Sequence, residues 1–311
     1  MIKPVSRGDA FLKNVAGSMK TSQRLHIWWL GHSAFLIQWN GEHLLLDPFL
    51  SERLTAPDGE ELERVTEPVV EPGLLDFIDV IAVGSLRPDH CDVSALKSVL
   101  SASPQVTLLV PEAVRTQLTE KLDCPESAVV GMEDDSAVRL GSIALIGVAG
   151  EEPPKDQESG EGHSPTRLGY VAQLGPWTIY HGSGTPFYEG LEERLSRHAI
   201  DIAVLPVSDS LVLSGGKGAA MNGIEAARLA RNLDVRLAIP SHYEMFSEDL
   251  GGVDEFVSHC QQLGQAYRQL RCGERWSDAE IEELAAPEDY EDELLERFGG
   301  KSRFRLEEGD E

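Results

Sequence analysis

The feature that most constrains the fold is a short apolar run that changes abruptly into a polar loop. Residues 79–84 read DVIAVG, and their length and apolar character predict a buried strand. The loop that follows carries Arg87, Asp89 and His90, and Asp92 then stands where it would cap a helix. Loops between a rigid strand and a rigid helix often hold catalytic and ligand residues. Alone, an adjacent Asp and His more often serve as a helix cap and a hydrogen-bonded histidine.

Length and hydrophobicity set the broad class of the chain. Its 311 residues, of which 41% are apolar, can form one large domain or two small ones. We expect no membrane-spanning helix, because no run of eighteen apolar residues occurs, and the N-terminus lacks the apolar stretch of a secretion signal. The four cysteines stand at unrelated spacings, which is typical of a reduced, cytoplasmic protein rather than of a disulfide framework: Cys91, Cys124, Cys260 and Cys272.

The charge of the chain limits its partners. A net charge of −26 should repel nucleic acid, and no basic stretch offsets it. Residues 277–311 hold 14 acidic and 4 basic side chains, so this tail alone carries −10. An acidic protein of this kind either gains solubility or tolerance of high salt, or uses the tail to bind a dedicated partner. The sequence leaves the oligomeric state open, a homo-oligomer included.

Strands and helices alternate along the chain, and each half begins with a hairpin. Asn40-Gly41 joins strands expected over 34–39 and 42–47, and a second hairpin is expected over 168–181. This order predicts an α/β protein in which two mixed sheets pack together with helices outside, a four-layer αββα sandwich. We expect residues 51–72 to form a loop without regular structure, and residues 253–270 to be mostly helical.

Polar side chains recur at the ends of the expected strands. Ligand and catalytic residues of α/β proteins commonly gather at one edge of a sheet, beyond the strand ends. The repetition makes a shared site more convincing than any single histidine would be. The residues in question are His32, Asp47, Asp89, His90, His181 and His242.

Five segments resemble, in order, the motifs of the metallo-β-lactamase fold, and most closely those of its L-ascorbate-6-phosphate lactonase-like branch. They are WLGHSAFLI, LLLDPFL, the strand and loop that end in Asp89-His90, IYHGSGT and IPSHYEMF. The resemblance covers residues 25–276, which leaves an N-terminal extension at 1–24 and an acidic tail at 277–311. It implies an αββα sandwich with a metal site where the two sheets meet. Most members hydrolyse lactones, esters, phosphodiesters or amides.

The chain departs from the family at the first of two metal positions. The family's central motif is Thr/Ser-His-x-His-x-Asp-His, and residues 84–90 read GSLRPDH. Ser85 and Arg87 therefore replace two ligand histidines. Glu151 stands where the resemblance implies a third histidine, and Gly184 stands where it implies the aspartate that bridges two metals.

The ligands that the resemblance implies for the second metal are all present as Asp89, His90 and His242. One carboxylate, two imidazoles and an open position make a legitimate catalytic zinc set. We expect one divalent metal there, zinc, manganese or iron, or none if the pocket is closed. His32 is the first candidate for a proton donor, or else it fixes its turn by a hydrogen bond, and Asp47 is expected to order the groups around the site.

Arg87 is informative because a guanidinium is always charged and cannot ligate a metal. We expect it to fill the first metal position and to pair with Glu151 or Asp89. The alternative is that the loop has drifted and Arg87 points into solvent.

Two functions follow from these observations. The first is a metal-dependent hydrolase that acts on a small lactone, ester or phosphoester through a mononuclear site, with Asp89 and His32 as catalytic residues. The second is a non-catalytic pseudoenzyme, a binding or scaffold protein in which Arg87 and Glu151 replace the first metal site.

Overall fold

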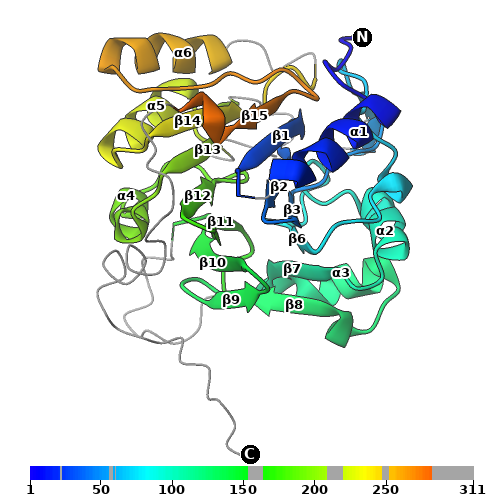
Figure 1. The fold of residues 1–311 in the computed structure, drawn as a ribbon. Coiled ribbons are helices and arrows are strands. Elements are labelled where there is room, and N and C mark those ends of the chain that lie inside the picture. Colours follow the sequence, from blue (N-terminus) through cyan, green and yellow to red (C-terminus); the bar gives the residue numbers. More distant parts are fainter. Residues whose placement is uncertain are drawn as a thin grey trace, which may run out of the picture.

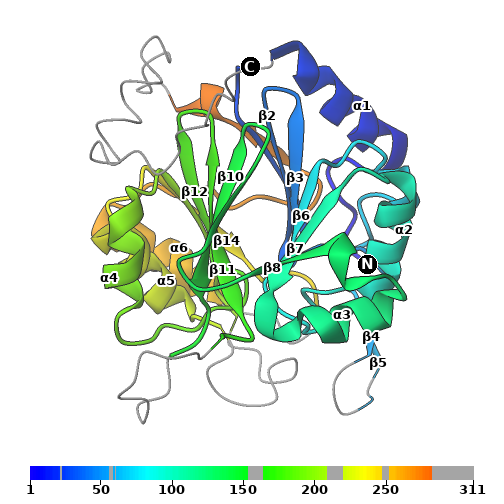
Figure 2. The same ribbon diagram turned by 90° about the horizontal axis from the view of Figure 1, so that it is seen from below.

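The computed structural model describes residues 1–21, 23–55, 59, 61–152, 164–208, 220–246 and 252–281. Two β-sheets face each other, and helices cover the outer face of each sheet (Figures 1 and 2). This arrangement is the four-layer αββα sandwich that the sequence predicts. Within the described ranges, no helix combines the length and apolar character that crossing a membrane requires.

The first sheet has seven strands, in the order β15-β1-β2-β3-β6-β7-β8. Its first part is antiparallel, and the β2–β3 turn places Asn40 and Gly41 at φ of 50° and 85°. From β3 to β8 the strands are parallel, so their carboxyl ends share one edge. The bounds are β1 (His26–Gly31), β2 (Ala34–Trp39), β3 (Glu42–Leu46), β6 (Val80–Ala82), β7 (Thr107–Pro111), β8 (Val129–Met132) and β15 (Arg275–Ser277).

The second sheet has six strands, in the order β14-β13-β12-β11-β10-β9. Strands β9 to β12 are antiparallel neighbours, and β12, β13 and β14 run parallel. The ends of β12 and β14 therefore also meet at one edge. The bounds are β9 (Ala137–Leu140), β10 (Ile143–Ala149), β11 (Leu168–Leu174), β12 (Trp177–His181), β13 (Ile202–Pro206) and β14 (Leu237–Ser241).

Three helices cover each sheet (Figure 2). Helices α1 (Gly8–Ser18), α2 (Val93–Ala102) and α3 (Arg115–Leu122) lie on the first sheet, and α4 (Leu191–Leu195), α5 (Gly223–Asn232) and α6 (Gly252–Leu263) on the second. As expected, the Asp92 carboxylate caps α2 by accepting from the Ala95 amide. Six short 3₁₀ turns complete the described helices: Met19–Thr21, Pro72–Leu74, Glu112–Val114, Glu126–Ala128, Ser196–His198 and Asp278–Glu280.

The core lies between the two sheets and under the helices. Its largest fully buried side chains include Trp28, Trp29, Tyr170 and Tyr180. Helix α1 joins this core through Phe11 and Val15, because both side chains are buried against the first sheet. A small second cluster, Phe49, Leu54, Leu62, Met245 and Phe246, packs separately near the strand ends.

One expectation about regular structure is wrong, and the expectation that residues 253–270 are mostly helical is confirmed except at its end. The segment 51–72 contains a hairpin of β4 (Arg53–Thr55) and β5 (Glu61–Glu63), whose three-residue strands are too short to show a period of two. Helix α6 ends at Leu263, before Gly264 at φ 65°, so residues 264–270 are not helical. The chain then crosses back and adds β15 to the edge of the first sheet beside β1.

Candidate active site

Four polar residues of the site sit in turns that follow a strand. His32, Asp47, Ser183 and His242 come after β1, β3, β12 and β14, with φ of 50°, 41°, 50° and 63°. Left-handed backbone is uncommon for residues with a side chain and costs of order 1–3 kcal/mol where the surroundings impose it. The same conformation at four converging turns shows that the fold holds these side chains in set directions.

Asp47 lies at the centre of the buried network and joins the two sheets. From the first half of the chain it accepts hydrogen bonds from the Gly84 amide at 2.6 Å and from Nδ1 of His90 at 2.8 Å. From the second half it accepts from Nε2 of His181 at 3.0 Å and Oγ of Ser183 at 2.5 Å. Burial alone would raise the pKa of Asp47, but His90 and His181 outweigh it and hold the pKa below its ordinary value.

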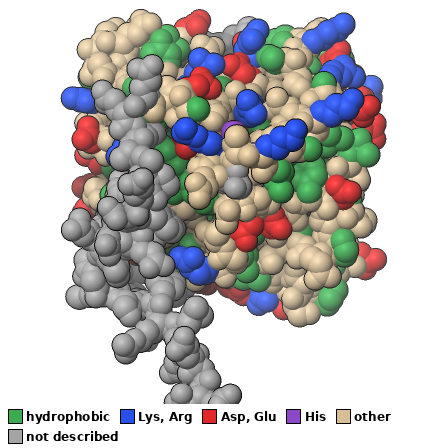
Figure 3. Space-filling view, viewed as in Figure 1, with side chains coloured by type: hydrophobic (Ala, Val, Ile, Leu, Met, Phe, Trp, Pro, Cys, Tyr) green, Lys and Arg blue, Asp and Glu red, His purple; other side chains and the backbone are tan. Residues whose placement is uncertain are grey.

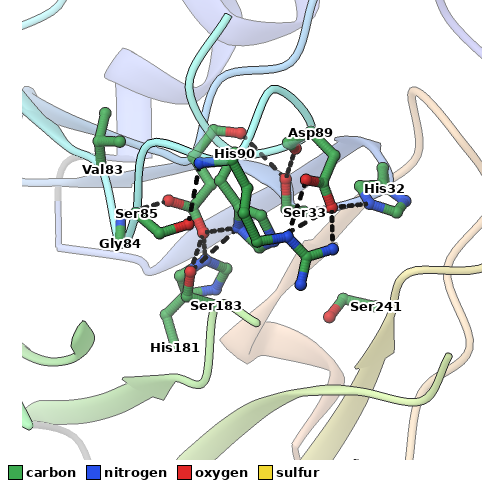
Figure 4. Close-up of polar contacts among 12 residues, drawn as sticks. His32, Ser33, Val83, Gly84, Ser85, Asp89, His90, His181, Ser183 and Ser241 are labelled. Atoms are coloured by element: carbon green, nitrogen blue, oxygen red, sulfur yellow. Dashed lines mark hydrogen bonds and ion pairs between the residues drawn. The ribbon is translucent and has the colours of Figure 1, made fainter. Parts of the chain in front are cut away.

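Asp89 is fully buried and is held by a guanidinium. Arg87 donates from Nε to Oδ1 at 3.0 Å and from Nη2 to Oδ2 at 2.7 Å. Nε2 of His32 lies 3.1 Å and Nε2 of His90 3.3 Å from the same Oδ2 (Figure 4). Arg87 therefore forms the expected pair with Asp89 and is not a solvent-directed side chain, since only 19% of its side chain is exposed.

His90 and His242 face each other across the site. Their Nε2 atoms are 3.2 Å apart, and Nδ1 of His242 lies 3.0 Å from Oγ of Ser241. Burial alone would lower the pKa of His90, but Asp89 and Asp47 outweigh it and raise the pKa to about 9. Burial, with the nearby His32 and His90, lowers the pKa of His242 well below its usual value. Either ring can donate in this contact, depending on its tautomer.

The spacing of the donor atoms fits a metal ion. Oδ2 of Asp89, Nε2 of His90 and Nε2 of His242 are separated by 3.3 Å and 3.2 Å along the two measured edges. A tetrahedral ion with bonds of about 2.0–2.1 Å holds its ligand atoms about 3.3 Å apart. Ligand atoms of His32, Asp89 and His242 all lie within 4.8 Å of one another, so His32 borders the same place.

Comparison with known proteins identifies the family. A sequence model of the beta-lactamase superfamily domain matches residues 26–242. The chain belongs to the beta-lactamase superfamily. Among its relatives is a UPF0173 metal-dependent hydrolase from Rubrobacter xylanophilus, 26% identical over 245 residues that cover 76% of this chain and 89% of the relative. The predicted superfamily is confirmed, and the lactonase-like branch stays a prediction.

Solved structures share the fold of this chain. Igni18, described as a metallo hydrolase from Ignicoccus hospitalis, has a TM-score of 0.60 at 17% identity, covering 82% of this chain and 98% of that one. A metallo-beta-lactamase fold protein from Bacillus subtilis has a TM-score of 0.57 at 13% identity, covering 82% and 99%. At these identities the likeness shows the metallo-β-lactamase fold and nothing finer.

The positions where this superfamily member departs from the family motifs now have known surroundings. Ser85 is buried, and its Oγ lies 3.4 Å from the amide of Arg87. The Glu151 carboxylate accepts from the Thr166 amide at 2.9 Å and lies 3.4 Å from Nε of Arg167. Of the two ion pairs expected for Arg87, with Glu151 or with Asp89, the structure shows the pair with Asp89.

Ser183 is a site residue that the sequence reasoning missed. Its Oγ reaches Asp47 at 2.5 Å and lies 3.0 Å from Nδ1 of His90. A Cβ placed on Gly84 would come within 2.1 Å of that Oγ. The absence of a side chain at Gly84 therefore makes room for the Ser183 hydroxyl.

Arg64 is a second residue that the sequence did not reveal. It is buried, and it donates to the carbonyl oxygens of Leu30 at 3.4 Å, Phe49 at 3.2 Å, Ser51 at 3.3 Å and Thr66 at 3.1 Å. Leu30 lies at the end of β1, two residues before His32, whereas Phe49 and Ser51 follow Asp47 and Thr66 follows β5. Arg64 therefore fixes the backbone that presents the site, and no local pattern predicts such contacts.

Proposed function

We propose that this protein is a metal-dependent hydrolase with a single divalent ion held by Asp89, His90 and His242. The observation that carries the proposal is the distance from Nε2 of His90 to Oδ2 of Asp89 and to Nε2 of His242, 3.3 Å and 3.2 Å, because both are close to the spacing of ligand atoms around one tetrahedral ion. The name of the Rubrobacter relative, a metal-dependent hydrolase, supports it. Zinc is the first candidate, with manganese and iron as alternatives.

The residues of the chain prepare this site before any substrate arrives. Asp47 engages Nδ1 of His90, which turns Nε2 toward Asp89 and His242. Phe49 and Phe246 lie edge-on to the His32 ring, with centroids 6.4 Å and 5.6 Å away, and shield it from water. A bound divalent ion would supply Lewis acidity toward a carbonyl or phosphoryl oxygen and acidify a water.

His32 is the proposed proton donor to the leaving group. Its Nε2 lies 3.1 Å from Oδ2 of Asp89, and its ring centroid is 4.3 Å from that of His242. We propose a small lactone, ester or phosphoester as the substrate, since a chain of net charge −26 disfavours nucleic acid. We propose the cytoplasm as the location, since the four cysteines are free thiols.

A non-catalytic binding role is the second candidate, and one observation favours it. Arg87 already neutralises Asp89 through a two-pronged contact, so the site holds together without a metal. In that case the buried hydrogen bonds around Asp47 and Asp89 would stabilise the fold and would have no catalytic role.

Metal content of the purified protein decides between the two. We expect about one equivalent of zinc, manganese or iron per chain, with the metal and the hydrolysis of a lactone and ester panel both lost in Asp89→Asn and His242→Ala. Asp201→Asn is the matched control, because Asp201 is also buried but accepts from the Thr178 amide away from the site. Protein free of metal, even after incubation with each ion, would overturn the hydrolase proposal and favour the binding role.

A further inference from the structure

The guanidinium of Arg87 is hydrogen-bonded to the carboxylate of Asp89, which is one of the proposed metal ligands. It uses Nε and Nη2 on the two oxygens of Asp89, at 3.0 Å and 2.7 Å. Charge-assisted contacts with this two-pronged geometry are among the strongest hydrogen bonds in proteins. Only Pro88 separates the two residues, so the pair forms within one loop.

Oδ2 of Asp89 has little capacity for another strong partner. Nitrogen atoms of Arg87, His32 and His90 already lie 2.7 Å, 3.1 Å and 3.3 Å from it. A cation that binds Oδ2 must displace at least one of them. It must also approach a guanidinium that keeps its charge at any pH at which the protein is folded, in buried surroundings where like charges repel strongly.

The structure also provides a route by which Arg87 can leave. Its side chain is 19% exposed, whereas that of Asp89 is fully buried. Because the contact is local, rotation of the Arg87 side chain toward solvent would open the carboxylate without moving β6 or β14.

We infer that Arg87 and the divalent ion compete for the carboxylate of Asp89, so that Arg87 sets the metal affinity of the site. The site then has two forms, one closed by the arginine and one occupied by the ion. Binding of either partner weakens the other by the same factor. This inference rests on the metal site of the proposed function.

Titration of metal-free protein with zinc tests the inference. Arg87→Gln should bind zinc about tenfold more tightly than the parent, or better, since the charge and the two-pronged contact are both removed. Arg87→Lys keeps the charge and loses the planar fork, so its affinity should lie between the two. Arg167→Gln, which removes a guanidinium beside Glu151, is the matched control and should leave the affinity unchanged.

A second measurement does not depend on activity. Zinc should raise the melting temperature of Arg87→Gln more than that of the parent, and Asp89→Asn in the Arg87→Gln background should abolish the difference. Equal zinc affinities of the parent and Arg87→Gln would overturn the competition and leave the hydrolase proposal standing. Absence of zinc binding in the parent and in both Arg87 variants would overturn the competition and the metal site together.

Discussion

Acid sensitivity should arise in part from one buried histidine, His26 on β1. Only 4% of the residue is exposed, its Nε2 lies 3.0 Å from Oγ1 of Thr21, and its Nδ1 has no hydrogen-bond partner among the described residues. Burial, with Arg275 and Arg24 nearby, lowers the pKa of His26 to about 4. Lys and Arg side chains lie on this face of the molecule with Asp and Glu side chains among them (Figure 3).

The sign and size of the effect follow from that pKa. Between pH 6.5 and 4 the unfolded chain binds a proton at His26 and the folded chain does not, so the free energy of unfolding falls as the pH falls. At about 1.4 kcal/mol per pH unit, His26 alone removes about 3 kcal/mol across this window. The stability that His26 contributes is complete above pH 6.5.

Urea denaturation at pH 7, 6, 5 and 4 measures this contribution. We expect His26→Gln to lose about 3 kcal/mol less than the parent between pH 7 and 4, because glutamine does not titrate. His43, His198 and His242 also have lowered pKa values, so only the difference between the two proteins isolates His26. Parallel pH profiles for parent and variant would refute the reasoning.

Three further substitutions test packing and hydrogen bonding by urea denaturation. Gly84→Ser should cost about 2 kcal/mol or more, and adding Ser183→Gly should recover part of that loss, because two of the three close atoms at that Cβ belong to the Ser183 side chain; strictly additive costs would contradict this. Arg64→Met should destabilise by about 3 kcal/mol, since three buried carbonyls and one partly buried carbonyl lose this donor, and a cost under about 1 kcal/mol would show that water replaces it. Asn222→Ala should cost about 1 kcal/mol through loss of the capping box of α5, and an unchanged midpoint would rule that cap out as a source of stability.

The fold was largely predictable because its main signals are local. The Asn40-Gly41 turn, the apolar runs of the strands and the Asp92 cap each act over a few residues. Strand β15 was not predictable in this way, because it belongs to the first sheet only through pairing with β1, about 250 residues earlier in the chain.

The site was predictable in its residue types and less so in its contacts. His32, Asp89, His90 and His242 do converge, as their positions after successive strands suggested. Pairing of Arg87 with Asp89 was one of two alternatives, and only three-dimensional geometry could choose between them. The role of Ser183 depends on a contact with Asp47, 136 positions away, and such contacts leave no local trace.

Asp47 has a consequence for how the molecule assembles. Its four hydrogen bonds come in equal parts from the two halves of the chain, so neither half alone can satisfy this buried carboxylate. A half that folded first would carry an uncompensated charge or unpaired imidazoles at its open face, which is costly. The two halves should therefore fold together. The hydrogen bonds of Asp47 can all form only when the two sheets have packed against each other.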